Sequence, residues 1–214
     1  MRLVLVRHGQ TTSNVDDLLD TAEPGADLTD LGREQAAALV DALAGEPVES
    51  VWVSTLVRTQ QTAAPFAAAR GLVPTVRAGL REVQAGDLEM RGDLPAIQEF
   101  MGVVAAWFRG DLDARVPGAE SGGEVLARFD AVVDEIVATG EGCAMVVAHG
   151  AVLRVWAALR CGNVDGPVQA RAPLSNTGVI VVEGEPGAWE ARVWDGDAVG
   201  GPAVSDTVHD GPTG

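Results

Sequence analysis

The stretch LVLVRHGQTTSN, residues 3–14, joins an apolar run directly to an arginine, a histidine and a glycine. The run from Arg2 to Val6 predicts a short buried strand, because every residue after Arg2 in it is apolar. An imidazole has a pKa of about 6.5 and is partly charged near neutral pH, so its burial costs free energy. A histidine directly after a buried strand therefore needs an explanation. Either His8 is a polar residue where the strand reaches solvent, or it is a reactive group held at the end of a sheet.

Continuous apolar runs alternate with segments of helical periodicity along most of the chain. Strands are expected at residues 2–6, 49–54, 72–78, 143–149, 176–184 and 188–196, and helices at residues 28–45, 56–71, 93–110, 121–140 and 151–162. Continuous rather than alternating apolar runs are typical of parallel strands with both faces covered. The pattern predicts an α/β fold, a three-layer α/β/α sandwich with a mostly parallel central sheet and one antiparallel edge strand.

The 214 residues fit one domain, and 47% of them are hydrophobic, which is enough for a sizeable core. We assign residues 1–194 to an α/β domain with a helical insertion at about 91–117. Residues 195–214 are rich in glycine, proline and aspartate, and we expect a flexible tail there. Within the insertion, Met101, Trp107 and Phe108 lie at near-helical spacing, which favours packing over a substrate wall.

The formal net charge of -16 argues against nucleic-acid and anionic-membrane partners, since both need a basic face. No stretch approaches the ~18 apolar residues of a membrane span, and the N-terminus lacks the layout of a signal peptide, so we expect a cytoplasmic protein. Cys143 and Cys161 are expected to be buried free thiols. All 15 basic side chains are arginines, so an anion site here must use arginine, histidine or backbone N–H groups.

Polar side chains follow three of the predicted strands. Arg7 and His8 come after the first strand, His149 ends the strand near residue 149, and Arg58 lies one turn into the helix after Ser54. Ligands of such sheets bind beyond the carboxyl ends of the strands. We therefore expect the two histidines and the two arginines to share one site.

Two imidazoles and two guanidinium groups around one point suit a phosphoryl group. Guanidinium groups bind phosphate oxygens through forked hydrogen bonds, and the glycine after each histidine lets a ligand approach the backbone closely. One imidazole can attack phosphorus and form a phosphohistidine, while the other stabilises charge on the equatorial oxygens. Glu82, in LREVQAGDLEM, is the candidate acid that protonates the leaving oxygen.

Several segments of the chain resemble those of a known family. LVLVRHGQTTSN resembles the signature of the histidine phosphatase superfamily, which has the phosphoglycerate mutase-like fold. Further segments are similar to family segments and follow in the family's order: LTDLGREQA, VSTLVRTQQTA, LREVQAGDLE, PGAESGGEVLARF and VVAHGAVLR. Together they span about residues 2–176, which is most of the chain.

The resemblance implies a role for each matching position. His8 would be the phosphorylated nucleophile, Glu82 the proton donor, and the phosphate pocket would be formed by Arg7, Arg58 and His149. Asn14 matches an asparagine that contacts phosphate, although it could be only a helix or turn cap. The backbone N–H of Gly150 or Ala151 would hold an oxygen, and Ser54 matches a serine that supports the loop of Arg58.

The expected activity is that of a phosphomonoesterase, which hydrolyses small phosphorylated metabolites through a phosphohistidine on His8. The alternatives are phosphoryl transfer of the phosphoglycerate mutase type and a non-catalytic phospholigand-binding domain. The resemblance implies that a mutase has extra basic residues over the pocket. The insertion instead offers only Arg91, Arg109 and Arg115 beside apolar residues, which predicts an apolar lid. Residues 15–29 carry five acidic residues and no arginine where many members carry an arginine and a Gln-Gly pair, which disfavours a mutase further.

No metal and no other cofactor is expected, because arginines and an imidazolium supply the charge that magnesium supplies in many phosphoryl-transfer sites. Asp16, Asp17 and Asp20 fit no standard calcium loop, and a solvated face is expected for them. Residues 15–29, here called the acidic loop, either bend away from the pocket or select a less charged or cationic leaving group. The expected partner is a small phosphorylated substrate, and a homodimer is possible because family members include dimers and monomers.

Overall fold

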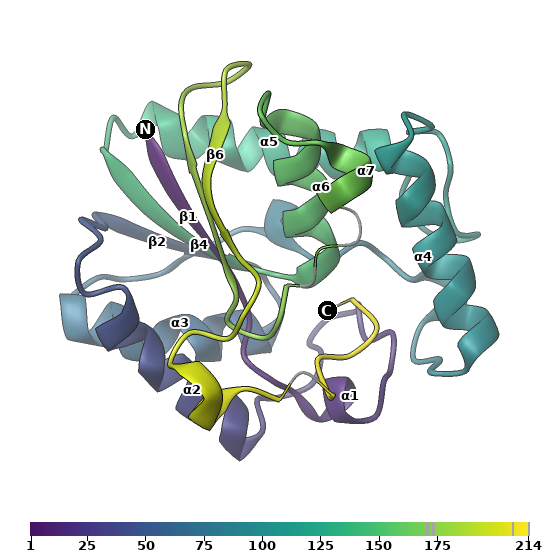
Figure 1. Ribbon diagram of the computed structural model, residues 1–214, viewed down its shortest axis with the longest axis horizontal. Helices are drawn as coiled ribbons and strands as arrows, with labels where there is room; N and C mark the ends of the chain where they lie inside the picture. Colours follow the sequence, from purple (N-terminus) through teal and green to yellow (C-terminus); the bar gives the residue numbers. More distant parts are fainter. Residues whose placement is uncertain (170–171, 173, 207, 214) are drawn as a thin grey trace.

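The computed structural model describes residues 1–169, 172, 174–206 and 208–213, which form a six-stranded sheet with helices on both faces (Figure 1). The strands are β1 (Arg2–Arg7), β2 (Ser50–Val53), β3 (Thr75–Val76), β4 (Cys143–Ala148), β5 (Val179–Glu183) and β6 (Glu190–Asp195). The α-helices are α1 (Thr12–Val15), α2 (Asp30–Ala42), α3 (Val57–Arg70), α4 (Leu94–Phe108), α5 (Gly122–Ala138), α6 (Gly150–Arg160) and α7 (Gly166–Gln169). Three short 3-10 helices complete the described elements: η1 (Ala78–Leu80), η2 (Gly86–Leu88) and η3 (Gly201–Val204).

The strand order in the sheet is β3-β2-β4-β1-β5-β6. The first four strands of this order pair in parallel, whereas β5 pairs antiparallel with β1 on one side and with β6 on the other. The predicted α/β class with a mostly parallel central sheet is confirmed. In one detail the sheet differs from the prediction: the strand that runs against the others, β5, is not at the edge, because β6 pairs outside it and returns to the common direction.

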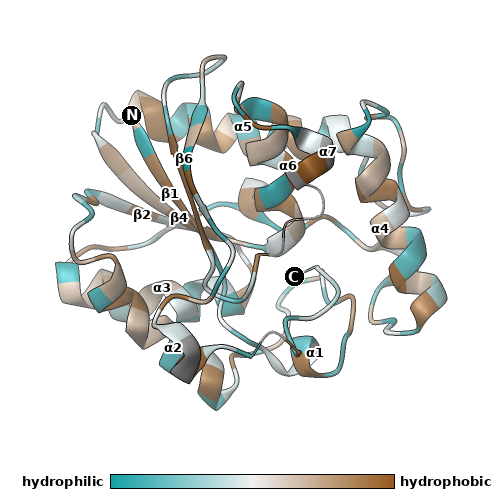
Figure 2. Ribbon diagram, in the orientation of Figure 1, coloured by the Kyte–Doolittle hydropathy of each residue, from teal (hydrophilic) through white to brown (hydrophobic). Residues whose placement is uncertain are grey.

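The two faces of the sheet have separate cores, because successive side chains of a strand point to opposite faces. On β1, Leu3 and Leu5 pack with side chains of α5 and α6, whereas Val4 and Val6 pack with those of α2 and α3. The four side chains are fully buried, and the central strands are largely brown, the apolar end of the scale, in Figure 2. Both faces of β1 are therefore covered, and only its end is available to a ligand.

Local signals set where the helices around the site begin. Thr29 caps α2 by accepting a hydrogen bond from the N–H of Gly32, and Ser121 with Glu124 forms the capping box of α5. The helix α3 continues through Pro65 as one element. The short strand β3 lies at the edge of the sheet, as the proline before it predicts.

The predicted insertion contains α4, whose C-terminal end packs into the core shared with α5 and α6. Trp107 is fully buried and Phe108 is 7% exposed, so the packing interpretation of these aromatic side chains is confirmed. Within the described ranges of the chain, no helix is both long and apolar enough to cross a bilayer. Cys143 and Cys161 are buried free thiols, as expected.

The domain boundary at residue 194 and the flexibility of residues 195–214 stay predictions. The described residues of that segment nevertheless have a defined course. The 3-10 helix η3 lies against α2, and the chain after it passes beside α1 toward the carboxyl ends of the central strands (Figure 1).

Candidate active site

His8 and His149 lie side by side because their strands are neighbours in the sheet. Arg7, the last residue of β1, is in register with Ala148, the last residue of β4, and the N–H of His8 donates to the carbonyl of Ala148 over 3.0 Å. The centroids of the two imidazole rings are 5.2 Å apart, and the angle between the ring planes is 63°. Both histidines are buried. Two distant parts of the chain therefore meet at the ends of β1 and β4, where the sequence predicts that they meet.

The hydrogen bond of the His8 ring fixes which nitrogen is free. Nδ1 lies 2.8 Å from the carbonyl oxygen of Gly9. Because a carbonyl oxygen only accepts, Nδ1 carries the proton and the neutral ring keeps a lone pair on Nε2. Burial, and then the charges of Arg58 and Arg7, hold the pKa of His8 well below 6.5. The ring is therefore neutral at pH 7, and Nε2 can act as a nucleophile.

Two glycines let the turn after β1 approach α2 closely. A Cβ on Gly9 would lie 2.6 Å from the carbonyl oxygen of Gly32, and a Cβ on Gly32 would lie 2.1 Å from that of Gln10. Both distances are far shorter than a van der Waals contact, so neither position accepts a side chain. The N–H of Gly9 donates to Thr62 Oγ1 on α3 over 2.9 Å, which fixes the backbone next to His8.

His149 is held between Ser54 and Arg58. Arg58 Nε donates to His149 Nδ1 over 3.3 Å, so the ring carries its proton on Nε2 and donates it to Ser54 Oγ over 2.8 Å. Burial, and then the charge of Arg58, hold the pKa of His149 well below 6.5. Ser54 Oγ also accepts from the N–H of Leu56, so this serine contacts both the loop that leads to Arg58 and the histidine.

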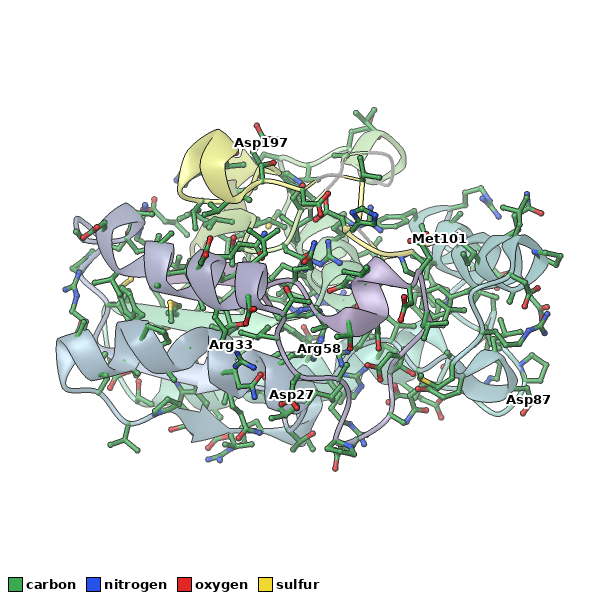
Figure 3. The ribbon with its side chains drawn as sticks, turned by 90° about the horizontal axis from the view of Figure 1, so that it is seen from below. Asp27, Arg33, Arg58, Asp87, Met101 and Asp197 are labelled. Atoms are coloured by element: carbon green, nitrogen blue, oxygen red, sulfur yellow. The ribbon has the colours of Figure 1, made fainter. Side chains whose placement is uncertain are left out.

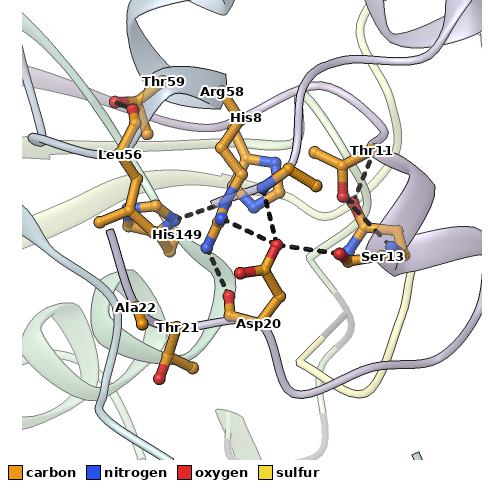
Figure 4. Close-up of polar contacts among 12 residues, drawn as sticks. His8, Thr11, Ser13, Asp20, Thr21, Ala22, Leu56, Arg58, Thr59 and His149 are labelled. Atoms are coloured by element: carbon orange, nitrogen blue, oxygen red, sulfur yellow. Dashed lines mark hydrogen bonds and ion pairs between the residues drawn. The ribbon is translucent and has the colours of Figure 1, made fainter. Parts of the chain in front are cut away.

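Arg58 meets a carboxylate of the acidic loop (Figure 4). Its Nη2 donates to the backbone carbonyl of Asp20 over 2.8 Å, and its Nη1 lies 3.5 Å from Asp20 Oδ2. The Asp20 side chain is 8% exposed and accepts hydrogen bonds from Ser13 Oγ and from the N–H of Ala26. The expected solvated face is therefore wrong for Asp20, because the guanidinium and two further donors draw this carboxylate inward.

The guanidinium of Arg7 is fully buried and is held by backbone carbonyls. Its Nη1 donates to the carbonyl of Leu174 over 2.7 Å, and its Nη2 donates to the carbonyl of Asp210. Burial lowers the pKa of Arg7 to about 10, so the side chain stays charged at neutral pH. Among the described residues, Arg7 Nε and Arg58 Nη1 have no hydrogen-bond partner. They are two buried donors that a bound oxyanion would satisfy.

Asn14 has a local role and also points toward the site. Its Oδ1 accepts from the N–H of Thr11 over 3.0 Å, as part of the capping box of α1. Its Nδ2 donates to the carbonyl of Asp210 over 3.3 Å. The interpretations of Asn14 as a cap and as a phosphate contact are therefore compatible in geometry.

Glu82 lies against the N-terminus of α6. Its Oε1 accepts from the N–H groups of Val83 (2.8 Å) and Val152 (2.9 Å), and its Oε2 accepts from that of Ala151 (3.1 Å). The positive end of the helix stabilises a carboxylate at this place. The N–H of Ala151, one of the two groups expected to hold an oxygen, is therefore already engaged by Glu82. Gly150, the other, is the first residue of α6.

Arg128 on α5 holds the loop that carries Glu82. Its guanidinium donates to the carbonyls of Gly79 (2.7 Å), Arg81 (2.8 Å) and Glu82 (2.9 Å), and it pairs with Glu120 over 2.8 Å. These contacts fix the backbone from which the Glu82 side chain projects. Arg128 is not among the residues that the sequence predicts for the site, although it lies in the segment PGAESGGEVLARF.

Five of the residues described above, namely His8, Asn14, Asp20, Arg58 and Glu82, border a cavity with a volume of about 20 Å³, close to the space that a single water molecule needs. Its described lining is His8, Thr11, Ser13, Asn14, Leu18, Leu19, Asp20, Thr21, Arg58, Glu82, Pro212 and Thr213. None of these residues belongs to α4, and Met101 on α4 lies apart from Arg58 in Figure 3. The expected apolar lid is therefore wrong, because the aromatic side chains of α4 are used in the core.

The last part of the chain contributes to the site, which the sequence did not predict. Pro212 and Thr213 line the cavity, and the Asp210 carboxylate accepts from Ser175 Oγ over 2.7 Å and from the N–H of Asn176 over 2.9 Å. A segment rich in glycine, proline and aspartate has the composition of a solvated linker. Its partners are more than thirty positions away, so no local pattern indicates them.

A metal site is not evident in the part of the chain that the structure describes, where no three or more histidine, cysteine, aspartate or glutamate side chains are grouped to hold an ion. The groups that could hold an anion are the guanidinium, amide and imidazole groups described above.

Comparison with protein families gives one match over most of the chain. A sequence model described as histidine phosphatase superfamily (branch 1) matches residues 3–197. The matched range begins inside β1 and ends just after β6, and it contains every residue predicted for the site.

Two curated proteins illustrate the similarity. The PE-PGRS family protein PE_PGRS11 of Mycobacterium tuberculosis is 37% identical over 224 residues; the match covers 95% of this chain but 38% of that protein, so the chain spans well under half of this relative's length. The glucosyl-3-phosphoglycerate phosphatase of Mycolicibacterium vanbaalenii is 31% identical over 216 residues, which cover 92% of this chain and 95% of that protein.

Two solved structures are similar over the same extent. A mycobacterial glucosyl-3-phosphoglycerate phosphatase in complex with VO3 has a TM-score of 0.76 and 28% identity, over 91% of this chain and 98% of that one. The α-ribazole phosphatase of Shigella flexneri has a TM-score of 0.73 and 27% identity, over 91% of this chain and 96% of that one.

Proposed function

The chain belongs to the histidine phosphatase superfamily, and from this premise we propose that it hydrolyses phosphomonoesters of small metabolites through a phosphohistidine on His8. The observation that carries the proposal is the pair of buried imidazoles with ring centroids 5.2 Å apart, next to the guanidinium groups of Arg7 and Arg58. The neutral His8 ring offers a lone pair on Nε2, and the guanidinium groups offer positive charge to the oxygens of the group under attack.

In the first step His8 Nε2 attacks phosphorus, the bond from phosphorus to the ester oxygen breaks, and the leaving oxygen takes a proton from Glu82. Glu82 lines the same cavity as His8, which supports this role.

In the second step a water molecule attacks the phosphohistidine, Glu82 takes a proton from the water, and the phosphorus–nitrogen bond breaks to release inorganic phosphate and neutral His8. Arg7 and Arg58 stabilise the charge on the non-bridging oxygens in both steps, and His149 lies beside them with its ring held by Arg58 and Ser54. Asn14 and the backbone at Gly150 supply further contacts to the bound phosphoryl group.

The surroundings of the cavity favour a phosphatase over a phosphoglycerate mutase. Asp20 places a carboxylate beside Arg58, and the open groove that begins at Thr21 is lined by Glu23 and Glu89 with a single arginine. A mutase must bind a leaving group that itself carries a carboxylate, and the carboxylates at this place repel it. We therefore expect a leaving group that is less negatively charged or cationic.

The test is phosphate release from a panel of phosphorylated metabolites in the presence of EDTA. The panel includes glucosyl-3-phosphoglycerate, α-ribazole phosphate, 3-phosphoglycerate and 2,3-bisphosphoglycerate. Release of phosphate from one or more monoesters, unaffected by EDTA, is the expected result. Interconversion of phosphoglycerates without net release would replace the phosphatase with a mutase, and phosphate binding without release or labelling of His8 would indicate a binding domain.

Other features of the chain are also proposals. A domain boundary near residue 194, a cytoplasmic location and the exclusion of nucleic-acid partners rest on the sequence, and a homodimer rests on the resemblance to a family that includes dimers.

A further inference from the structure

Residues 208–213, here called the strap, lie over the side chains that are proposed to bind phosphate. The carbonyl oxygen of Asp210 accepts hydrogen bonds from Arg7 Nη2 and from Asn14 Nδ2, the latter over 3.3 Å. The carbonyl oxygen of Thr213 stands 2.3 Å from the place that a Cβ on Gly150 would take, and Arg7 Nε is 3.1 Å from the same place. Two acceptor oxygens of the strap therefore lie among the donors that a phosphoryl group needs.

The strap is anchored by a side chain that does not itself touch those donors at hydrogen-bond distance. The Asp210 carboxylate is 12% exposed and accepts from Ser175 Oγ and from the N–H of Asn176, while its Oδ1 is 4.0 Å from Arg7 Nη1. Just before the strap, Asp206 accepts from Gln10 Nε2 over 3.1 Å. The anchor and the acceptor carbonyl thus belong to the same residue, Asp210, and can be separated by mutation.

With the strap in place the cavity holds about 20 Å³, and Pro212 and Thr213 form part of its wall. This is about the space of one water molecule, whereas a phosphoryl group has several oxygen atoms of that size. The strap in this position and a bound phosphoryl group therefore exclude each other.

We propose that the strap is an autoinhibitory segment whose carbonyl oxygens take the place of phosphate oxygens, so that a substrate must displace it. The proposal rests on the proposed function in one respect, namely that Arg7 and Asn14 bind the phosphoryl group. A segment that competes within the same molecule lowers the apparent affinity by the fraction of molecules in which it is displaced. It leaves the chemistry of the open state unchanged, so it raises KM without lowering kcat.

The first test measures the binding of inorganic phosphate to the full chain by calorimetry. Asp210→Ala removes the anchor and should lower the dissociation constant about tenfold, the effect of about one net hydrogen bond. Val208→Ala is the control within the strap, because this side chain is 78% exposed, and it should leave the dissociation constant unchanged. Asp210→Asn removes the charge next to Arg7 but keeps an oxygen for the anchor, so its dissociation constant for phosphate should fall clearly less than that of Asp210→Ala.

An unchanged dissociation constant for Asp210→Ala, or a failure of every variant to bind phosphate, would overturn the proposal. If the dissociation constants of Asp210→Asn and Asp210→Ala fall equally, the proposal is also overturned. Removal of the Asp210 charge, which repels phosphate, would then explain both results. With an active substrate, Asp210→Ala should lower KM by the same factor and leave kcat unchanged.

The second test uses the unmodified protein and hydrogen exchange of its backbone amides. Saturating inorganic phosphate should make the amides of residues 208–211 exchange faster, because the strap is displaced. Slower or unchanged exchange would show that the strap closes over the anion or never opposed it, and would overturn the proposal. Neither binding nor exchange depends on turnover. A chain that hydrolyses no phosphomonoester but gives both results would therefore lose the proposed function and keep the strap.

Discussion

Arg58 donates a hydrogen bond from Nε to Nδ1 of His149 over 3.3 Å, so the second histidine of the site is neutral and carries its proton on Nε2. The sequence suggested that an imidazolium would help to neutralise the substrate. In the free protein that charge comes from guanidinium groups instead, because burial and the charge of Arg58 keep His149 unprotonated. In the proposed mechanism Arg58 therefore has two roles, since it supplies charge to the phosphoryl group and sets the tautomer of His149.

Replacement of Arg58 by alanine should cost at least about 3 kcal/mol of transition-state stabilisation, or a loss of more than about hundredfold in kcat/KM, as expected for a lost donor aimed at developing charge. Arg33→Ala, which removes an exposed arginine from α2, makes the same change of net charge and should alter kcat/KM by less than about twofold. Steady-state kinetics with one ester, after circular dichroism has verified folding, measures both. A loss of less than about tenfold for Arg58→Ala would contradict the assigned role.

Replacement of His8 by alanine should abolish turnover and leave the fold intact, because the phosphorus atom then has no nitrogen nucleophile. The direct readout is rapid acid quenching after mixing with a labelled phosphomonoester, followed by detection of an acid-labile phosphoenzyme. The unmodified chain should acquire label, and so should His209→Ala, since His209 lies outside the cavity and pairs with Asp206. Retention of more than a trace of activity in His8→Ala would remove the covalent mechanism.

Replacement of Glu82 by glutamine should harm esters with poor leaving groups much more than aryl phosphates. An alkoxide needs a proton as it departs, whereas an aryl oxide leaves readily without one. The measurement is the ratio of kcat/KM for an alkyl and an aryl phosphate, with Glu99→Gln as the control because this glutamate is exposed on α4. If both esters lose activity by the same factor, Glu82 only supports the N-terminus of α6.

Replacement of Arg128 by alanine should reproduce part of the Glu82 effect, because three of its hydrogen bonds hold the backbone on which Glu82 stands. We expect a larger loss on the alkyl ester than on the aryl ester, and little further loss when Arg128→Ala is added to Glu82→Gln. Arg77→Ala is the matched control, since Arg77 also pairs with a glutamate, Glu135, but is more exposed than Arg128. Additive losses in the double variant would show that Arg128 acts on stability and not through Glu82.

The sheet and the meeting of the two histidines could be predicted because local patterns determine them. Apolar runs identify β1 and β4, and parallel pairing brings their ends together, so His8 and His149 follow from strand positions alone. The inward turn of Asp20 could not be predicted in this way. Its partner Arg58 is 38 positions away, and an aspartate in an acidic loop looks the same in sequence whether it is solvated or paired.

Whether α4 covers the pocket or packs in the core could not be predicted from the sequence either. An apolar helix such as α4 can cover a pocket or complete a core, and its periodicity does not distinguish the two. The structure uses Trp107 in the core, and a segment with the composition of a solvated tail covers the pocket instead. Side-chain contacts over 196 positions, such as that of Asn14 with Asp210, have no signature in the sequence between them.

The pH dependence of kcat/KM should reflect the lowered pKa of His8. Burial is the largest cause of the lowering, and the charges of Arg58 and Arg7 add to it. A lowered pKa means that the protonated, non-nucleophilic ring forms only at lower pH, so the acidic limb of kcat/KM should lie below pH 6.5. The measurement is kcat/KM for an aryl phosphate from acidic to neutral pH, corrected for the ionisation of the ester itself.

The same shift has a consequence for stability whose sign can be checked independently. Below pH 6.5 the unfolded chain binds protons at positions 8 and 149 that the folded chain does not, so the free energy of unfolding should fall as the pH falls through this range. In Arg58→Ala one repelling charge is gone, and NMR titration should show both imidazole pKa values moving upward. An acidic limb centred above pH 6.5 in the unmodified chain would contradict the lowered pKa of His8. Imidazoles in Arg58→Ala that titrate at lower pH than before would contradict the repulsion between Arg58 and the two rings.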